Sequence, residues 1–204
     1  MNMNNKASRT GEYGKKISGI VRIAVIAALT LTAFSYYVFG QSPSDYNTYI
    51  LKYYKTAIRQ QKKYKIPASI ILAQAILESG AGKSYLATEG NNHFGIKCKP
   101  EWTGRCIYKD DNEKKECFRK YASSADSFED HSLFLANRIY YKPLFKLQPT
   151  DYKAWAKGLK ECGYATDSLY ATKLIKLIDR YKLYYYDTAN ETDLPLMMPL
   201  MTKK

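Results

Sequence analysis

A single carboxylate, Glu78, ends an otherwise apolar run that extends from Pro67 to Leu77, and Ser-Gly-Ala-Gly follows it at once. Pro67 suits the first turn of a helix and Gly80 suits the residue just past its end, so we predict a helix with Glu78 in its last turn. The negative end of the helix dipole and the apolar neighbours both disfavour the ionised form of a carboxylate there. A carboxylic acid that stays protonated near neutral pH can act as a general acid. A surface glutamate at a frayed helix end would show the same local pattern.

The elements around Glu78 are mostly helical. Capping residues and apolar periodicity predict helices over about 42–64, 67–78, 123–140, 150–163 and 166–183, with Pro143 breaking the third. Thr150 is expected to cap the fourth helix, and Thr166 or Asp167 the last one. Gly90 to Gly95 is typical of a loop. Alternating residues over 105–109 and 116–121 flank Asp-Asp-Asn and predict a short β-hairpin. The expected fold class is therefore α+β.

The residues before 41 are expected to lie outside the folded domain. An apolar run over 23–39 is just long enough to span a bilayer, and basic residues precede it: Lys6, Arg9, Lys15, Lys16 and Arg22. This pattern favours a cytoplasmic N-terminus over 1–16 and a transmembrane anchor over 17–40. A signal peptide cleaved before Gln41 is the alternative. Both interpretations place a domain over 41–186 outside the cytoplasm, followed by a disordered or loosely packed tail over 187–204.

The 204 residues carry a formal net charge of +13, which suggests a polyanionic partner without choosing among nucleic acid, anionic lipid and an acidic cell-wall polymer. The export signal opposes a nucleic-acid partner. The 20 tyrosines and two tryptophans suit stacking on flat ligands such as sugars, although most tyrosines serve ordinary packing.

Export makes the four cysteines potential disulfides. Cys98 and Cys117 bracket the predicted hairpin and are the preferred pair, and Cys106 and Cys162 are either a second pair or free thiols. A zinc site would need a closely spaced cysteine pair or an HExxH sequence, and the chain has neither. We therefore expect no metal and no cofactor.

Several further motifs accompany the Glu78 segment in a fixed order. Together they resemble the glucosaminidase family of bacterial cell-wall hydrolases, glycoside hydrolase family 73, which includes the catalytic domain of the flagellar muramidase. The landmarks are Ile66-Pro67-Ala68-Ser69, the segment over 73–80, Asn92-His93-Phe94-Gly95-Ile96-Lys97, Trp102-Thr103-Gly104, Phe118-Arg119-Lys120-Tyr121, Ser127-Phe128-Glu129-Asp130 and Gly163-Tyr164-Ala165-Thr166-Asp167. Each motif is weak by itself, but the ordered set is specific, and the resemblance covers roughly 45–187.

The resemblance implies a lysozyme-like α+β fold with a substrate groove between a helical lobe and the hairpin. It also implies hydrolysis of the β-1,4 bond after N-acetylglucosamine in peptidoglycan. Glu78 matches the general acid of the family, in agreement with the helix-end argument. Tyr164 matches a functionally important tyrosine, whose expected role is to hydrogen-bond substrate or to support the charge that develops at the cleaved sugar.

The second catalytic group is left open. Family members carry an acid in the hairpin that can activate water, and here Asp111 is favoured, followed by Asp110. A hairpin turn also favours the Asp-Asp-Asn sequence for structural reasons. An acetamido sugar can instead supply its own nucleophile, which would make a second acid less essential.

Residues near Glu78 supply the expected binding site. Asn92, His93 and Phe94 should lie beside Glu78, with His93 as a structural or substrate hydrogen-bonding group. Trp102 is a candidate sugar platform, although a core tryptophan would look the same. Asp130 is expected to support a neighbouring residue of the site.

We consider three hypotheses for the function, two enzymatic and one non-catalytic. The leading hypothesis is an envelope-anchored endo-β-N-acetylglucosaminidase that acts on peptidoglycan glycan strands. A lytic transglycosylase would also use one glutamate in a lysozyme-like fold but would form an anhydro product. A non-catalytic peptidoglycan-binding module is the third, and the intact Glu78 motif argues against it.

Overall fold

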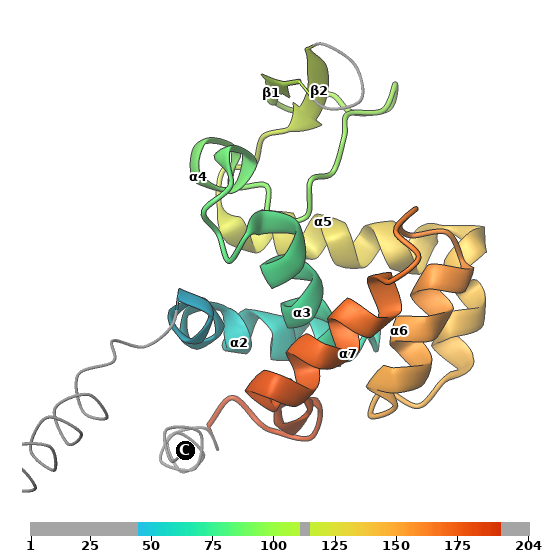
Figure 1. The fold of residues 1–204 in the computed structure, drawn as a ribbon. Coiled ribbons are helices and arrows are strands. Elements are labelled where there is room, and N and C mark those ends of the chain that lie inside the picture. Colours follow the sequence, from blue (N-terminus) through green and yellow to red (C-terminus); the bar gives the residue numbers. More distant parts are fainter. Residues whose placement is uncertain (1–44, 111–114, 193–204) are drawn as a thin grey trace, which may run out of the picture. The chain divides into compact units, whose positions relative to one another are not determined.

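The computed structural model describes residues 45–110 and 115–192. The helices in this part are α2 (Asp45–Tyr64), α3 (Ala68–Ser79), α4 (Tyr85–Gly90), α5 (Ser124–Asn137), α6 (Tyr152–Glu161) and α7 (Tyr170–Tyr181). Two 3-10 helices, η1 (Ile139–Lys146) and η2 (Leu183–Asp187), and two strands, β1 (Cys106–Lys109) and β2 (Glu116–Arg119), complete the set (Figure 1). The α+β class is confirmed.

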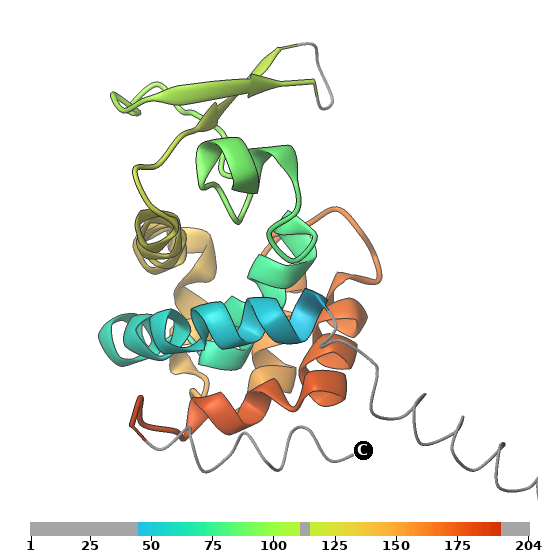
Figure 2. The ribbon, with the colours of Figure 1, turned by 90° about the vertical axis from the view of Figure 1, so that its left-hand side faces the viewer.

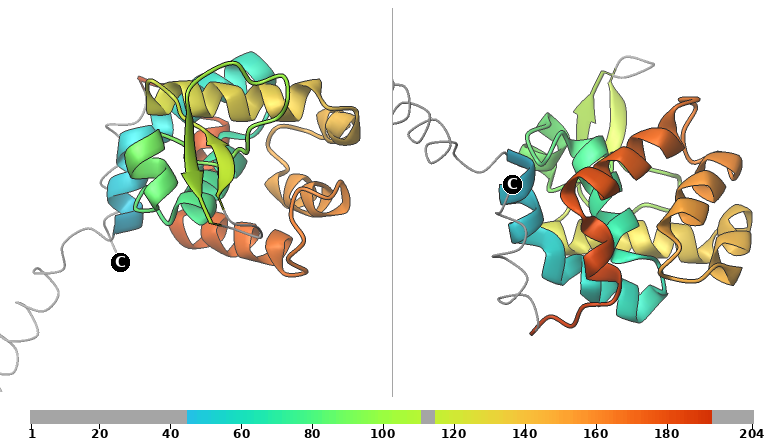
Figure 3. Two further views of the ribbon diagram at one scale, coloured as in Figure 1. Left: turned by 90° about the horizontal axis from the view of Figure 1, so that it is seen from above. Right: turned by 60° about the horizontal axis from the view of Figure 1, so that its bottom comes forward.

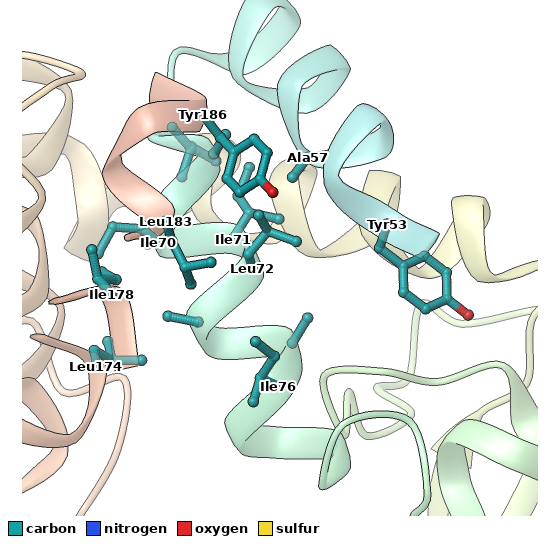
Figure 4. Packing of buried hydrophobic residues seen from close by; sticks show 14 of the residues in the cluster. Tyr53, Ala57, Ile70, Ile71, Leu72, Ile76, Leu174, Ile178, Leu183 and Tyr186 are labelled. Carbon is teal, nitrogen blue, oxygen red and sulfur yellow. The ribbon is translucent and has the colours of Figure 1, made fainter. Parts of the chain in front are cut away.

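Helix α3 is the centre of the core. All of its residues except Leu77 and Glu78 are buried, so it is covered by protein on nearly every side. Figure 4 shows its isoleucines and leucine between side chains of three neighbouring elements, the helices α2 and α7 and the short η2. The right-hand view in Figure 3 shows α7 and η2 running next to α3. The helix that carries Glu78 is therefore anchored by the largest apolar cluster of the described residues.

A carboxylate from far along the chain satisfies the N-terminus of α3. Pro67 precedes the helix and provides no side-chain cap. Asp187 accepts hydrogen bonds from the backbone N–H of Ser69 (2.8 Å) and from its hydroxyl (2.7 Å). The tail from Asp187 onward was expected to be loosely packed, but Asp187 is buried at the end of η2. The helix N-terminus explains this difference, because its free N–H groups need acceptors.

The C-terminus of α3 follows the prediction. Gly80 has a φ of 57°, a left-handed conformation that glycine adopts without steric cost. The Ser79 hydroxyl then accepts a hydrogen bond from the Gly82 N–H at 2.7 Å, which closes the turn after the helix. Glu78 thus lies in the last turn of a helix with a well-defined end.

The hairpin forms a second, smaller lobe with α4, which the sequence analysis missed. Strands β1 and β2 are antiparallel, with Ile107 opposite Phe118. Leu86 of α4 forms a separate buried cluster with these two residues. Figure 2 shows α4 and the strand pair together on one side of the helices, and the left view of Figure 3 shows the strands crossing over them. The predicted Cys98–Cys117 disulfide is present and ties the loop before β1 to β2.

Helix α5 begins as predicted but ends early. Ser123 and Asp126 form a capping box at its start. The helix stops at Asn137 because Arg138 is extended (φ −93°, ψ 129°), and Pro143 lies inside η1, so it does not end α5 as predicted.

The next two helices begin later than predicted. Asp151, and not Thr150, caps α6 by accepting a hydrogen bond from the Ala154 N–H at 3.0 Å. Helix α7 starts at Tyr170 because Asp167 accepts a hydrogen bond from the Leu169 N–H at 2.9 Å, which keeps residues 164–169 in a loop. That loop faces Glu78.

Candidate active site

A groove of about 600 Å³ lies at the exposed end of α3. It is bounded by the end of α3, the loop over 94–99, Arg119 of β2, the end of α5, the loop over 164–167 and the start of α7. Its lining residues are Leu77, Glu78, Phe94, Gly95, Ile96, Lys97, Lys99, Arg119, Phe134, Arg138, Tyr164, Ala165, Thr166, Asp167, Tyr170 and Lys173. The two residues of α3 that are not buried, Leu77 and Glu78, are thus the ones that face the groove.

Glu78 is a solvent-exposed residue at the wall of the groove, although its carboxyl group lies among packed side chains. Burial raises the pKa of its carboxyl above the usual range, and a hydrogen bond from Tyr170 lowers it by less. Burial is therefore the main reason that the protonated acid is favoured, as the apolar helix sequence predicts. An accessible carboxylic acid of this kind can give its proton to a bound substrate.

Tyr170 is the closest functional partner of Glu78, and the sequence analysis missed it. Its hydroxyl donates to Glu78 Oε1 at 3.0 Å. Gln74, which precedes Glu78 by one helical turn on α3, donates from Nε2 to the same hydroxyl at 3.1 Å. A buried glutamine inside the apolar run over 67–77 was the available signal, because a buried amide requires a hydrogen-bond partner.

Tyr164 lines the groove next to Tyr170. The two rings stack with centroids 5.5 Å apart and an interplanar angle of 27°. Burial raises the pKa of the Tyr164 hydroxyl, and the charge of Glu78 raises it further. The hydroxyl of Tyr164 is thus a neutral donor close to the carboxyl of Glu78.

His131 supports the groove from behind. Its ring stacks on Phe94 at 3.9 Å with an interplanar angle of 11°, and it meets the edge of Tyr164 at 6.1 Å. Burial lowers the pKa of His131 to about 3, so the ring is neutral at physiological pH. It connects two groove-lining aromatic side chains without a charge of its own.

Of the three loop residues expected beside Glu78, only Phe94 lines the groove. Asn92 is buried, and its amide binds the backbone of Ile96 and the carbonyl of Arg119, which shapes the loop. His93 is also buried, and its ring nitrogens contact Tyr49 Oη at 2.8 Å and Ser124 Oγ at 3.0 Å. Asn92 and His93 therefore hold the two lobes together beneath the groove.

Trp102 and Asp130 both bind Arg119, which lines the groove. The Arg119 guanidinium lies 4.6 Å from the centre of a Trp102 ring. Asp130 accepts two hydrogen bonds from Arg119 Nη1, at 3.0 and 2.9 Å, and one from Tyr121 Oη at 2.5 Å. Trp102 is not among the lining residues, but it contacts two of them, Arg119 through its ring and the Lys99 carbonyl through its backbone N–H. Asp130 thus orients Arg119 and Tyr121, and its supporting role in the site stays a prediction.

Of the two candidate hairpin acids, Asp110 is within the described residues and Asp111 is not. The role of Asp111 therefore stays a prediction. Asp110 accepts a hydrogen bond from the Lys115 N–H at 2.8 Å, within the hairpin turn, and it does not line the groove. Among the described lining residues the carboxyl groups are Glu78 and Asp167. A hydrogen bond from Lys173 at 2.5 Å lowers the pKa of Asp167 and keeps it ionised.

No cluster of three or more His, Cys, Asp or Glu side chains suited to a metal ion occurs within residues 45–110 and 115–192. The groove therefore presents a carboxyl group with a raised pKa, two tyrosine hydroxyls and several cations. These are groups for acid catalysis and for binding a polar ligand.

Comparison with known proteins identifies the family. Residues 54–183 match the glucosaminidase family, described as mannosyl-glycoprotein endo-beta-N-acetylglucosaminidase. The chain belongs to this family. The resemblance stated from the motifs is thereby confirmed.

Several known proteins resemble the chain in sequence or in fold. Exo-glucosaminidase LytG of Bacillus subtilis is 39% identical over 140 residues, which cover 63% of this chain and 49% of LytG. The chain thus spans about half of the length of that relative. The catalytic domain of the autolysin Auto from Listeria monocytogenes is 32% identical with a TM-score of 0.62, covering 72% of this chain and 89% of that domain. The glycoside hydrolase domain of FlgJ from Salmonella typhimurium is 26% identical with a TM-score of 0.60, covering 74% and 97%. The lysozyme-like fold is therefore confirmed.

Proposed function

We propose that this glucosaminidase hydrolyses the β-1,4 bond after N-acetylglucosamine in peptidoglycan, with Glu78 as the general acid. The observation that carries the proposal is the carboxyl of Glu78 at the wall of a groove, which accepts a hydrogen bond from Tyr170 and whose pKa is raised by burial. The family match supports the type of bond, and the names of LytG and of an Enterococcus faecalis autolysin support a cell-wall substrate.

The first step is bond cleavage. Glu78 gives its proton to the glycosidic oxygen, the bond from that oxygen to the anomeric carbon breaks, and the leaving sugar departs as an alcohol. Glu78 is then an anion, and the hydrogen bond from Tyr170 stabilises it because bonds to charged acceptors are the stronger ones. We assign to the hydroxyl of Tyr164, a groove-lining residue, the role of supporting the charge on the cleaved sugar.

The second step adds water to the anomeric carbon and returns a proton to Glu78. Water attacks the anomeric carbon and loses a proton to a base, and exchange of that proton through solvent restores the acid form of Glu78, which completes hydrolysis. Asp111 is our first candidate for that base, followed by Asp110. The acetamido oxygen of the substrate is the alternative nucleophile, and in that case the reaction would not require a second carboxylate from the protein.

The products separate hydrolysis from the alternatives. We expect wild-type protein to release fragments that end in a reducing N-acetylglucosamine, measured by mass spectrometry of digested peptidoglycan. A lytic transglycosylase would release anhydro sugars that are lighter by one water. Binding of glycan strands without any release would favour the non-catalytic binding module.

The matched variant is Glu78→Gln, which keeps the shape of the side chain but has no proton to donate. We expect a loss of roughly 10²-fold or more in hydrolysis with glycan binding retained. Activity within a few-fold of wild type would overturn the assignment of Glu78.

We further propose that the domain acts outside the cytoplasm and that residues 17–40 anchor it in the membrane. The support is the basic and apolar sequence pattern of this segment, which lies outside the described residues. None of the helices within residues 45–110 and 115–192 has the length and apolar content needed to cross a bilayer. Cell fractionation together with N-terminal sequencing of the mature protein would test the anchor. A mature N-terminus at Gln41 would show cleavage.

A further inference from the structure

The groove is rich in cations. Its lining contains Lys97, Lys99, Arg119, Arg138 and Lys173, whereas its carboxyl groups among the described residues are Glu78 and Asp167. The five lining cations outnumber the two lining carboxyl groups. A bound ligand therefore meets a positive field.

Most of these cations already have acidic partners. Lys97 pairs with Glu116 at 2.7 Å, and Lys173 pairs with Asp167 at 2.5 Å. Arg119 pairs with Asp130, as described above. Their positive charge is thus largely balanced by the protein itself.

Lys99 and Arg138 have no such partner among the described residues, and Lys99 is exposed whereas Arg138 is half-buried. No carboxylate within residues 45–110 and 115–192 forms an ion pair with Arg138. Its guanidinium lies 4.1 Å from the centre of the Phe134 ring, which holds it in place. It is half-buried and follows directly after α5. A planar guanidinium with a fixed orientation and a free hydrogen-bonding edge suits a carboxylate, which it can bind through two parallel bonds.

The position of Arg138 connects it to the reaction centre. The Phe134 ring, which packs against the Arg138 guanidinium, also contacts the Tyr164 ring edge to face, with ring centroids 6.4 Å apart. Tyr164 in turn stacks on Tyr170, which binds Glu78. Arg138 and Glu78 thus line one groove and are connected through packed aromatic rings, so a single bound glycan can contact both.

From this geometry we propose that Arg138 forms a carboxylate-binding subsite, and that the preferred substrate is a glycan strand that bears carboxylates near the cleaved bond. The inference rests on the proposed function and adds a specificity-determining residue to it. A polymer of N-acetylglucosamine alone has no carboxylate. A peptidoglycan strand has carboxylates on its stem peptide or, once the peptide is removed, on the lactyl group of the muramic sugar.

The test compares three substrates with the purified full chain. They are peptidoglycan strands with stem peptides, the same strands after an amidase has removed the peptides, and neutral N-acetylglucosamine oligomers. For Arg138→Gln we expect kcat/KM to decrease on both kinds of substrate, but roughly tenfold more on a carboxylated substrate than on the neutral oligomers. The additional decrease should come mainly from a higher KM. A loss confined to the first substrate assigns the stem-peptide carboxylate, and a loss confined to the second assigns the lactyl carboxylate.

Arg180 provides a matched control. Its guanidinium lies 5.7 Å from the centre of the Tyr181 ring, and it is not among the groove-lining residues. Arg180→Gln removes the same charge and the same type of ring contact, and we expect its ratio of kcat/KM between substrates to equal that of wild type. Raising the ionic strength should weaken binding of the carboxylated strands more than binding of the neutral oligomers.

Equal losses on charged and neutral substrates, or an equal change in Arg180→Gln, would overturn the subsite. Affinities of the same three ligands, measured by calorimetry, distinguish failure of the subsite from failure of the proposed function, because binding can be measured without hydrolysis. If wild type hydrolyses none of them, a preference for carboxylated ligands that Arg138→Gln abolishes still supports the subsite. Affinities that Arg138→Gln leaves unchanged refute it.

Discussion

The hydrogen bond from Tyr170 to Glu78 gives the sharpest prediction. Tyr170→Phe removes the hydroxyl that donates to Glu78 Oε1 at 3.0 Å and keeps the ring that stacks on Tyr164. That bond lowers the pKa of Glu78, against the larger effect of burial, so its loss raises the pKa further. The alkaline limb of the kcat/KM profile, where Glu78 loses its proton in the free enzyme, should therefore move to higher pH.

The expected loss of rate follows from the charge that Glu78 acquires. After proton transfer Glu78 is an anion, and a hydrogen bond to a charged group is worth about 1.5–3 kcal/mol. Losing it raises the barrier of the proton-transfer step and should lower kcat roughly ten- to hundredfold, within the range in which Glu78 is protonated. The variant should thus be slower but active over a wider alkaline range.

The assay is the pH profile of fragment release from peptidoglycan, with melting temperatures to exclude unfolding. Tyr152→Phe is the matched control, because Tyr152 donates to the carboxylate of Asp179 at 2.6 Å on an exposed surface that does not line the groove. It should leave the profile unchanged. The reasoning would be refuted if Tyr170→Phe had the alkaline limb and the kcat of wild type. It would also be refuted if the alkaline limb moved to lower pH.

Three further predictions concern stability and the hairpin acids. Burial raises the pKa of Asp187 from 3.8 to about 7, so its contribution to stability is fully present below pH 3.8 and is lost as pH rises through about 7. Thermal melts of wild type and Asp187→Asn should therefore show a stability difference that falls as pH rises from 3.8 to about 7. A difference that stays constant over this range would contradict the assignment. The Cys98–Cys117 disulfide closes a loop with a sequence separation of 19, so replacing both cysteines by serine should cost about 3 kcal/mol in denaturant unfolding; an unchanged midpoint would argue against this contribution. If Asp111 activates water, Asp111→Asn should reduce fragment release far more than Asp110→Asn, and equal severe losses with a lower melting temperature would indicate a structural turn.

Local sequence patterns were sufficient for the elements that depend on neighbouring residues. The apolar run before Glu78, with a proline at its start and a glycine past its end, placed the acid in the last turn of α3. The alternating segments predicted both strands of the hairpin, and their spacing from Cys98 predicted its disulfide. Periodicity and capping act over a few residues, so they can be interpreted without knowledge of the remaining chain.

The ends of several elements required the tertiary structure. Helix α4 is short and is held by a cluster with the hairpin, so its local signal was weak. Helix α7 begins later than its candidate caps indicate, because Asp167 binds within the loop and to Lys173. Capping residues identify possible starts of a helix, and packing selects among them.

The partners of the catalytic acid could not be derived from local patterns. Tyr170 lies 92 residues after Glu78, and Asp187 lies 118 residues after Ser69, whose helix it caps. Asn92 and His93 are near Glu78 in sequence but turn into the protein, where the backbone of the loop and Tyr49 require their hydrogen bonds. The type of each side chain was visible in the sequence. Its direction was decided by which buried polar group of another element it had to satisfy, and that depends on how the whole domain packs.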